Sequence, residues 1–170
     1  MQSQRSKFVN HIRDTKPARP CETGYDLRLL SEREDCAYRD VYDVLVDDKS
    51  IGVVIKFPQR GRALKQNIEH SLFEARAVDR LKYDPQLKAL RRYKPTILWH
   101  EPSTVVIVMP KYRPVKYGEH FEGFQQTFRC MVNDLMTNMK FHFDYGERNF
   151  GLNSRGHYVL LDAGLLGETE

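Results

Sequence analysis

The stretch FHFDYGERNFGLNSRGHYVLLDAG, residues 141–164, decides how this sequence is interpreted. It begins with a polar loop that carries Asp144 and Asn149, five positions apart. Two short apolar runs follow, Phe150–Leu152 and 158–161, and the turn-forming sequence NSRG lies between them. Short apolar runs on either side of such a turn are typical of a β-hairpin.

The hairpin predicts a cluster of oxygen-bearing side chains. Because a hairpin returns its second strand to the start of its first, we expect Asp162 to lie beside Asn149. Asp144 belongs to the same loop, so three oxygen ligands converge on one point. A partial set of hard oxygen ligands, with room left for water and phosphate, suits Mg²⁺. The simpler alternative is that these side chains only form turns.

A first β-hairpin is predicted near the start of the chain. Residues 41–46 and 51–57 are rich in β-branched and aromatic side chains, and the polar sequence DDKS separates them. Side chains alternate between the two faces of a strand, so Val54 and Lys56 share one face. The simpler alternative for Lys56 is an exposed charge on an edge strand.

Two long helices and a second hairpin are also predicted. Apolar residues recur every three or four positions over 61–83 and over 119–140, as in amphipathic helices. Glu74 lies on the flank of the apolar stripe of the first helix, where it is either a functional side chain or a solvated one. Residues 96–99 and 104–109 predict the strands of the second hairpin.

In this order the features resemble the protein-kinase-like superfamily. The sequence HFD, four residues and Asn149, then Asp162-Ala163-Gly164, is similar to the catalytic and metal-binding loops of that family. The sequence VVIK, which ends at Lys56, resembles its strand-lysine motif. Glu74, eighteen residues later, corresponds to the partner glutamate, and residues 105–109 correspond to the strand that leads into the hinge.

The resemblance implies an α+β protein-kinase-like fold. We expect an N-terminal arm over 1–24 and an N-lobe over 25–112, built from an antiparallel sheet and the helix 61–83. A reduced helical C-lobe over 113–170 would end just after the Asp-x-Gly motif. Short proteins of this style are similar to kinases encoded by some tailed bacteriophages and to compact prokaryotic Ser/Thr kinases.

The resemblance also implies ATP-dependent phosphoryl transfer with Mg²⁺. Lys56 would neutralise the phosphates, and Glu74 would hold Lys56 through an ion pair. Asn149 and Asp162 would hold Mg²⁺, and Asp144 would orient the attacking hydroxyl. The residues expected to contact the nucleotide are Lys56, Val54, Met109, Asn149 and Asp162.

The sequence departs from the family pattern in three places. Residues 30–46 contain no glycine, so the glycine-rich phosphate loop is missing. Phe143 stands where the family carries an arginine, and no activation segment follows the Asp-x-Gly motif. We therefore expect a minimal Ser/Thr protein kinase or, as the alternative, a weak or inactive kinase-like module that inhibits or recruits a partner, such as a phage protein acting on a host target. A kinase of small molecules is a third reading.

Composition restricts the partners and the compartment. No apolar run approaches the roughly 20 residues of a membrane-spanning helix, and the basic start of the chain lacks the apolar stretch of a secretory signal. We expect a cytoplasmic protein, in the host cytoplasm if it is phage-encoded. The expected partners are a protein substrate or target, and a second copy or another protein covering the reduced C-lobe. We do not expect nucleic acid, because the net charge is only +4 and Lys88, Arg91, Arg92 and Lys94 are interpreted as a solvated face.

Overall fold

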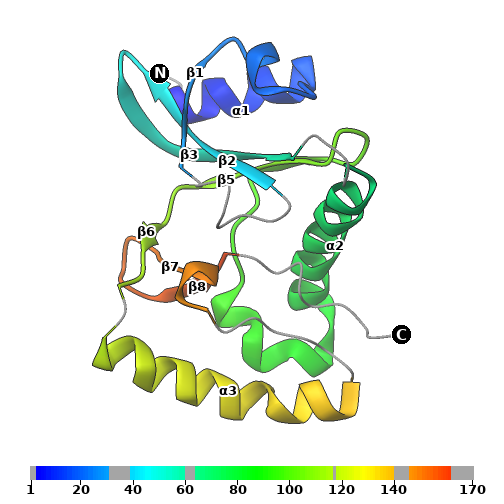
Figure 1. Cartoon of the computed structure of the whole chain (residues 1–170), viewed down its shortest axis with the longest axis vertical. Coiled ribbons are helices and arrows are strands. Elements are labelled where there is room, and N and C mark those ends of the chain that lie inside the picture. The colour runs from blue at the N-terminus through cyan, green and yellow to red at the C-terminus, as the bar shows by residue number, and fades with distance from the viewer. Residues whose placement is uncertain (1–2, 31–38, 60–63, 117, 140–145, 162–170) are drawn as a thin grey trace. The chain divides into compact units, whose positions relative to one another are not determined.

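The computed structural model describes residues 3–30, 39–59, 64–116, 118–139 and 146–161 (Figure 1). They form a mixed α+β structure with two antiparallel sheets, so the expected α+β class is confirmed. The chain forms two compact units, each described by itself below. The first contains residues 1–72 and 96–111, and the second contains residues 73–95 and 112–170.

The first unit is built around a five-stranded sheet in the order β1-β2-β3-β5-β4. Every neighbouring pair of strands is antiparallel. The strands are β1 (Asp26–Leu29), β2 (Arg39–Val46), β3 (Lys49–Pro58), β4 (Trp99–Glu101) and β5 (Val106–Pro110). The pairs β2–β3 and β4–β5 are the two hairpins predicted from sequence. Asp47 and Asp48 have φ values of 49° and 60° in the first turn, a backbone conformation that Asp tolerates better than most residues.

Helix α1 (Gln4–Thr15) packs against this sheet, over strands β3 and β4. The side chain of Ser3 caps its first turn by accepting a hydrogen bond from the N–H of Ser6 at 3.2 Å. Phe8 and Ile12 lie one turn apart on the helix, and both are fully buried in the core of the first unit. The segment expected as an N-terminal arm, residues 1–24, thus contains a helix whose apolar residues belong to the core of the first unit. Only three apolar residues, Phe8, Val9 and Ile12, mark the helix, and their contact with the core of the first unit stabilises it.

The second unit combines helices with a small sheet in the order β6-β7-β8. Its elements are η2 (Pro85–Tyr93), β6 (Arg113–Pro114), α3 (Glu119–Met139), η3 (Glu147–Asn149), β7 (Phe150–Leu152) and β8 (Tyr158–Leu160). Helix α2 (Leu64–Tyr83) begins in the first unit and ends in the second. The helices predicted over 61–83 and 119–140 and the C-terminal hairpin are thus present. Unlike the expected division at residue 112, the segment 73–95 groups with the C-terminal part of the chain.

Aromatic rings form the core of the second unit. Phe121 and Phe128 of α3 and Phe150 of β7 are each 1% exposed. Tyr93 contacts Phe128 edge-on, with ring centroids 5.3 Å apart. Phe128 contacts Phe150 in the same way at 5.2 Å. These contacts fix the β7–β8 hairpin against α3. No helix in the described part of the chain has the length and apolar character needed to cross a bilayer.

Candidate functional site

The candidate site lies on the face of the large sheet opposite α1. Residues paired directly across antiparallel strands point to the same side of a sheet. One row of such pairs runs through Arg28, Asp43, Val54 and Met109. The next row runs through Val41, Lys56, Ile107 and His100. We call these two rows the Lys56 face.

Lys56 is buried on this face. It belongs to β3, which lies between β2 and β5, and it is 8% exposed. Its neighbours Val54 and Met109 are 7% and 2% exposed, and they pair directly with each other. The alternative of an exposed edge-strand lysine is therefore wrong. The structure brings these three predicted residues together on one apolar surface that carries an ammonium group.

Glu74 lies in the second unit, on α2, and is 1% exposed. This burial excludes the alternative of a solvated helix residue. A carboxylate removed from water needs a cation or hydrogen-bond donors to remain charged. The ion pair between Glu74 and Lys56 stays a prediction.

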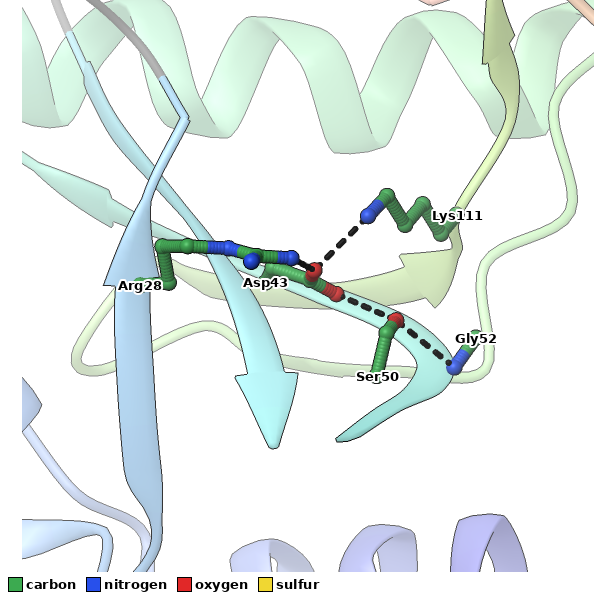
Figure 2. A network of polar contacts seen from close by, with 5 residues as sticks. All are labelled: Arg28, Asp43, Ser50, Gly52 and Lys111. Carbon is green, nitrogen blue, oxygen red and sulfur yellow. Dashed lines mark hydrogen bonds and ion pairs between the residues drawn. The ribbon is translucent and has the colours of Figure 1, made fainter. Parts of the chain in front are cut away.

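A second charged group on the Lys56 face was not predicted (Figure 2). Asp43 is fully buried, and its Oδ2 accepts from Arg28 Nη2 and from Lys111 Nζ, each at 2.7 Å. The hydroxyl of Ser50 donates to Asp43 Oδ1 at 2.6 Å, and the N–H of Gly52 donates to the Ser50 hydroxyl at 3.2 Å. This Asp43 network joins β1, β2, β3 and the residue after β5.

The network keeps Asp43 ionised. Burial alone raises the pKa of a carboxyl group, but the hydrogen bonds from Lys111, Ser50 and Arg28 outweigh burial and lower the pKa of Asp43. The sequence holds one signal for this group, because Asp43 interrupts the otherwise uncharged run of residues 41–46. It gives no sign of the partners, because Arg28 is 15 positions away and Lys111 is 68.

Asn149 lies at the start of the β7–β8 hairpin and is 9% exposed. Phe150 pairs with Leu160, and the N–H of Leu161 donates to the carbonyl of Asn149 at 2.7 Å. The residue before Asp162 is thus hydrogen bonded to the backbone of Asn149, as the hairpin interpretation requires. Asp144 and Asp162 lie outside the described residues, so the convergence of three oxygen ligands stays a prediction.

Gly151 allows β7 to pack closely against Tyr112 and Leu161. A Cβ atom at this position would lie 2.7 Å from Cβ of Tyr112 and 3.0 Å from Cδ2 of Leu161. The first of these atoms is attached to the backbone and cannot move aside. Glycine therefore permits the packing that positions the strand after Asn149.

The fit to Mg²⁺ depends on the chemistry of the donors. Among the residues that the structure describes, no three His, Cys, Asp or Glu side chains form a metal-binding group. Of the predicted ligands only Asn149 is described, and its buried amide oxygen is a hard donor of the kind Mg²⁺ binds. Together with the predicted ligand Asp162 it would give oxygen donors of the kind that Mg²⁺ prefers, and the metal stays a prediction.

Comparisons with known proteins give no family. No family model matches the chain, and no curated protein matches its sequence. Two solved structures are similar in part. One is the bifunctional kinase-methyltransferase WbdD, with a TM-score of 0.47 and 15% identity, covering 78% of this chain and 31% of that one. The other is Cex1p, with a TM-score of 0.45 and 17% identity, covering 86% of this chain and 27% of that one. The chain thus spans about a third or less of either structure, and at these TM-scores neither likeness establishes a shared fold.

Proposed function

We propose that this chain is a protein-kinase-like phosphotransferase that binds MgATP, and that it acts on Ser/Thr hydroxyls of a protein substrate. The observation that carries the proposal is the burial of Lys56 on the central strand of the sheet, beside Val54 and Met109. A buried ammonium group on an apolar surface suits a ligand that has both an apolar ring and a charged chain.

In the proposed reaction Lys56 neutralises the phosphates of the nucleotide. Because Lys56 is only 8% exposed, its charge acts in surroundings of low dielectric constant, where the attraction for phosphate is stronger than in water. Glu74 orients Lys56. Val54 and Met109 provide the apolar surface for the base.

The chain's own oxygen ligands complete the proposed site. Asn149 and Asp162 would hold Mg²⁺, which supplies neutralisation of the charge on the phosphates when it is bound. Asp144 accepts or orients the proton of the attacking hydroxyl. The hydrogen bond from Leu161 to Asn149 supports this assignment, because it holds the chain before Asp162 against the Asn149 backbone.

The Asp43 network supports the proposed site without contacting the reacting atoms. It connects β1 and β2 to Lys111, the residue after β5, through Asp43. Asp43 belongs to the row of paired residues next to the row that contains Lys56. Since residues 30–46 contain no glycine-rich loop, a fixed sheet surface takes the place of a loop that closes over the phosphates.

The proposal is tested by transfer of labelled phosphate from MgATP to the protein itself or to proteins of a cell extract. Lys56→Met keeps the apolar stem of the side chain and removes the charge, and Asp144→Asn removes the base. Both changes should abolish transfer. Lys49→Met, on an exposed position of the same strand, should leave transfer unchanged.

Two other outcomes would contradict the proposal, the first for the residue roles and the second for the activity. Transfer that persists in both Lys56→Met and Asp144→Asn would remove these residues from the mechanism. Binding of MgATP without any transfer by the wild-type protein would favour the second candidate, a kinase-like module that recruits or inhibits a partner. The buried Asp43 network is compatible with either function.

A further inference from the structure

The positive charge of this protein is concentrated in one short segment of the second unit. Residues 76–94 carry seven Lys or Arg side chains and two Asp side chains, a net charge of +5, whereas the whole chain has a net charge of +4. The rest of the chain is therefore slightly acidic. One of the two acids, Asp84, is already engaged, because it pairs with Arg80 at 3.5 Å and caps the N–H of Gln86.

The geometry of η2 arranges part of this charge in a row. A 3₁₀-helix has three residues per turn, so side chains three apart share a face. Leu87, Leu90 and Tyr93 form the buried face, with exposures of 0%, 1% and 9%. A second, exposed face carries Lys88 and Arg91, spaced by about 6 Å along the axis for a rise of about 2.0 Å per residue, and Lys94 follows directly as the C-cap residue of η2. We call these three residues the basic row.

An exposed aromatic ring lies next to the basic row. Tyr83 ends α2 and is 66% exposed, more than any other large hydrophobic side chain in the described part of the chain. Arg91 Nη2 donates to the carbonyls of Tyr83 and Asp84 at 3.4 and 3.2 Å, which attaches the row to the end of α2. Lys82 Nζ lies 4.6 Å from the centroid of the Tyr83 ring. The surface thus offers cations and a ring side by side.

We propose that the end of α2 and η2 form a binding surface for single-stranded nucleic acid. The basic row would contact successive phosphates, and the Tyr83 ring would stack on a base, which is how single strands are bound without sequence preference. This inference is independent of the proposed phosphoryl transfer. It departs from the expectation of a solvated face without nucleic acid, because the structure shows that residues 85–93 form a 3₁₀-helix whose apolar side is buried and whose basic side is exposed.

Two other partners fit this surface less well. A membrane-surface helix needs apolar side chains to insert into lipid, and the apolar face of η2 is buried in the protein. A protein interface is depleted in lysine at its core and is anchored by several apolar groups, whereas this surface is mostly Lys and Arg.

The inference is tested by fluorescence anisotropy with a labelled oligouridylate, the DNA oligothymidylate and a DNA duplex. Lys88→Glu with Lys94→Glu removes two phosphate contacts. It should weaken single-strand binding at least tenfold and reduce the slope of log K against log salt by about 1.4, at about 0.7 per contact. The matched control is Lys7→Glu with Lys49→Glu, which changes the net charge equally at exposed positions of the first unit. It should retain most of the binding.

Tyr83 provides a second test that does not depend on charge. Tyr83→Ala should weaken single-strand binding by about 5- to 150-fold, whereas Tyr83→Phe keeps the ring and should bind as the wild type does. Preference for the ribose or the deoxyribose strand would identify the natural ligand as RNA or DNA. The inference is overturned if the wild type binds neither strand, if the control pair loses as much affinity as Lys88→Glu with Lys94→Glu, or if a polyglutamate peptide or anionic lipid vesicles bind more tightly than the oligonucleotides.

Discussion

Asp43 is a carboxylate without access to water that three side chains stabilise. Arg28 and Lys111, its two cations, keep 57% and 32% of their side-chain surface exposed, so both remain in contact with water while Asp43 does not. If the cations were removed, water could not reach Asp43 to replace them, and its charge would remain buried without compensation. Stability should therefore depend more on Asp43 than on either cation.

Replacement of Asp43 by Asn should lower the free energy of unfolding by about 1–3 kcal/mol, because the amide keeps the shape but loses the charge that both cations contact. Urea denaturation measures the difference. The control is Asp47→Asn, in the exposed β2–β3 turn, where Asn also tolerates a positive φ and the change should stay within about 0.5 kcal/mol. Equal effects of the two substitutions would show that the Asp43 network contributes no stability.

Glu101 provides a prediction about pH. The hydroxyl and N–H of Ser103 donate to its Oε1 at 2.8 and 3.2 Å, and Lys16 Nζ lies 3.1 Å from its Oε2. Ser103 and then Lys16 lower the pKa of Glu101 from 4.5 to about 2. Because the folded pKa is the lower one, ionised Glu101 stabilises the protein fully above pH 4.5, and this contribution disappears as the pH falls towards 2.

Thermal unfolding of the wild type and Glu101→Gln across this pH range tests the prediction. The difference in melting temperature should be largest above pH 4.5 and should shrink towards pH 2. A difference that stays constant with pH would show that Glu101 acts through its shape and not through its charge.

At the scale of the element, the β7–β8 hairpin depends on one glycine. Gly151→Ala should destabilise the protein by about 1–3 kcal/mol, because the new methyl group would overlap with Cβ of Tyr112. The matched control is Gly123→Ala on the exposed surface of α3, where nothing lies within 4 Å. Since Ala favours a helix more than Gly does, the control should stabilise the protein by about 0.5–1 kcal/mol. A destabilising effect of the same size in both variants would contradict the packing described for β7.

Elements whose determinants are local could be predicted from the sequence. The hairpins β2–β3 and β7–β8 follow from alternation and turn residues, and α2 and α3 follow from long apolar stripes. The helix α1 could not be predicted, because only Phe8, Val9 and Ile12 carry its apolar face and the sheet that stabilises it lies elsewhere in the sequence. The strand β1 is four residues long and was missed for the same reason.

The same distinction applies to the candidate site. The position of Lys56 on one face with Val54 follows from alternation within a strand, and the return of Leu161 to Asn149 follows from the hairpin length. The Asp43 network could not be predicted, since its partners come from separate strands and from the chain after β5. The roles of Asp144 and Asp162 stay predictions.

At the scale of the whole molecule, the two proposed activities use different residues. The Lys56 face belongs to the first unit, and the basic row and Tyr83 belong to the second. Substitution of the basic row should therefore leave nucleotide binding at Lys56 unchanged. Substitution of Lys56 should likewise leave binding of single-stranded nucleic acid unchanged.

The central claim is that the ammonium group of Lys56 binds the phosphates of a nucleotide. An acyl-phosphate derivative of ATP transfers its acyl group to a lysine that lies beside the bound phosphates, and mass spectrometry of the digested protein identifies that lysine. We predict that Lys56 is acylated first and that excess MgATP protects it, while acylation of the exposed Lys49 is insensitive to MgATP. Acylation of exposed lysines alone, with Lys56 unmodified or unprotected by MgATP, would contradict the claim.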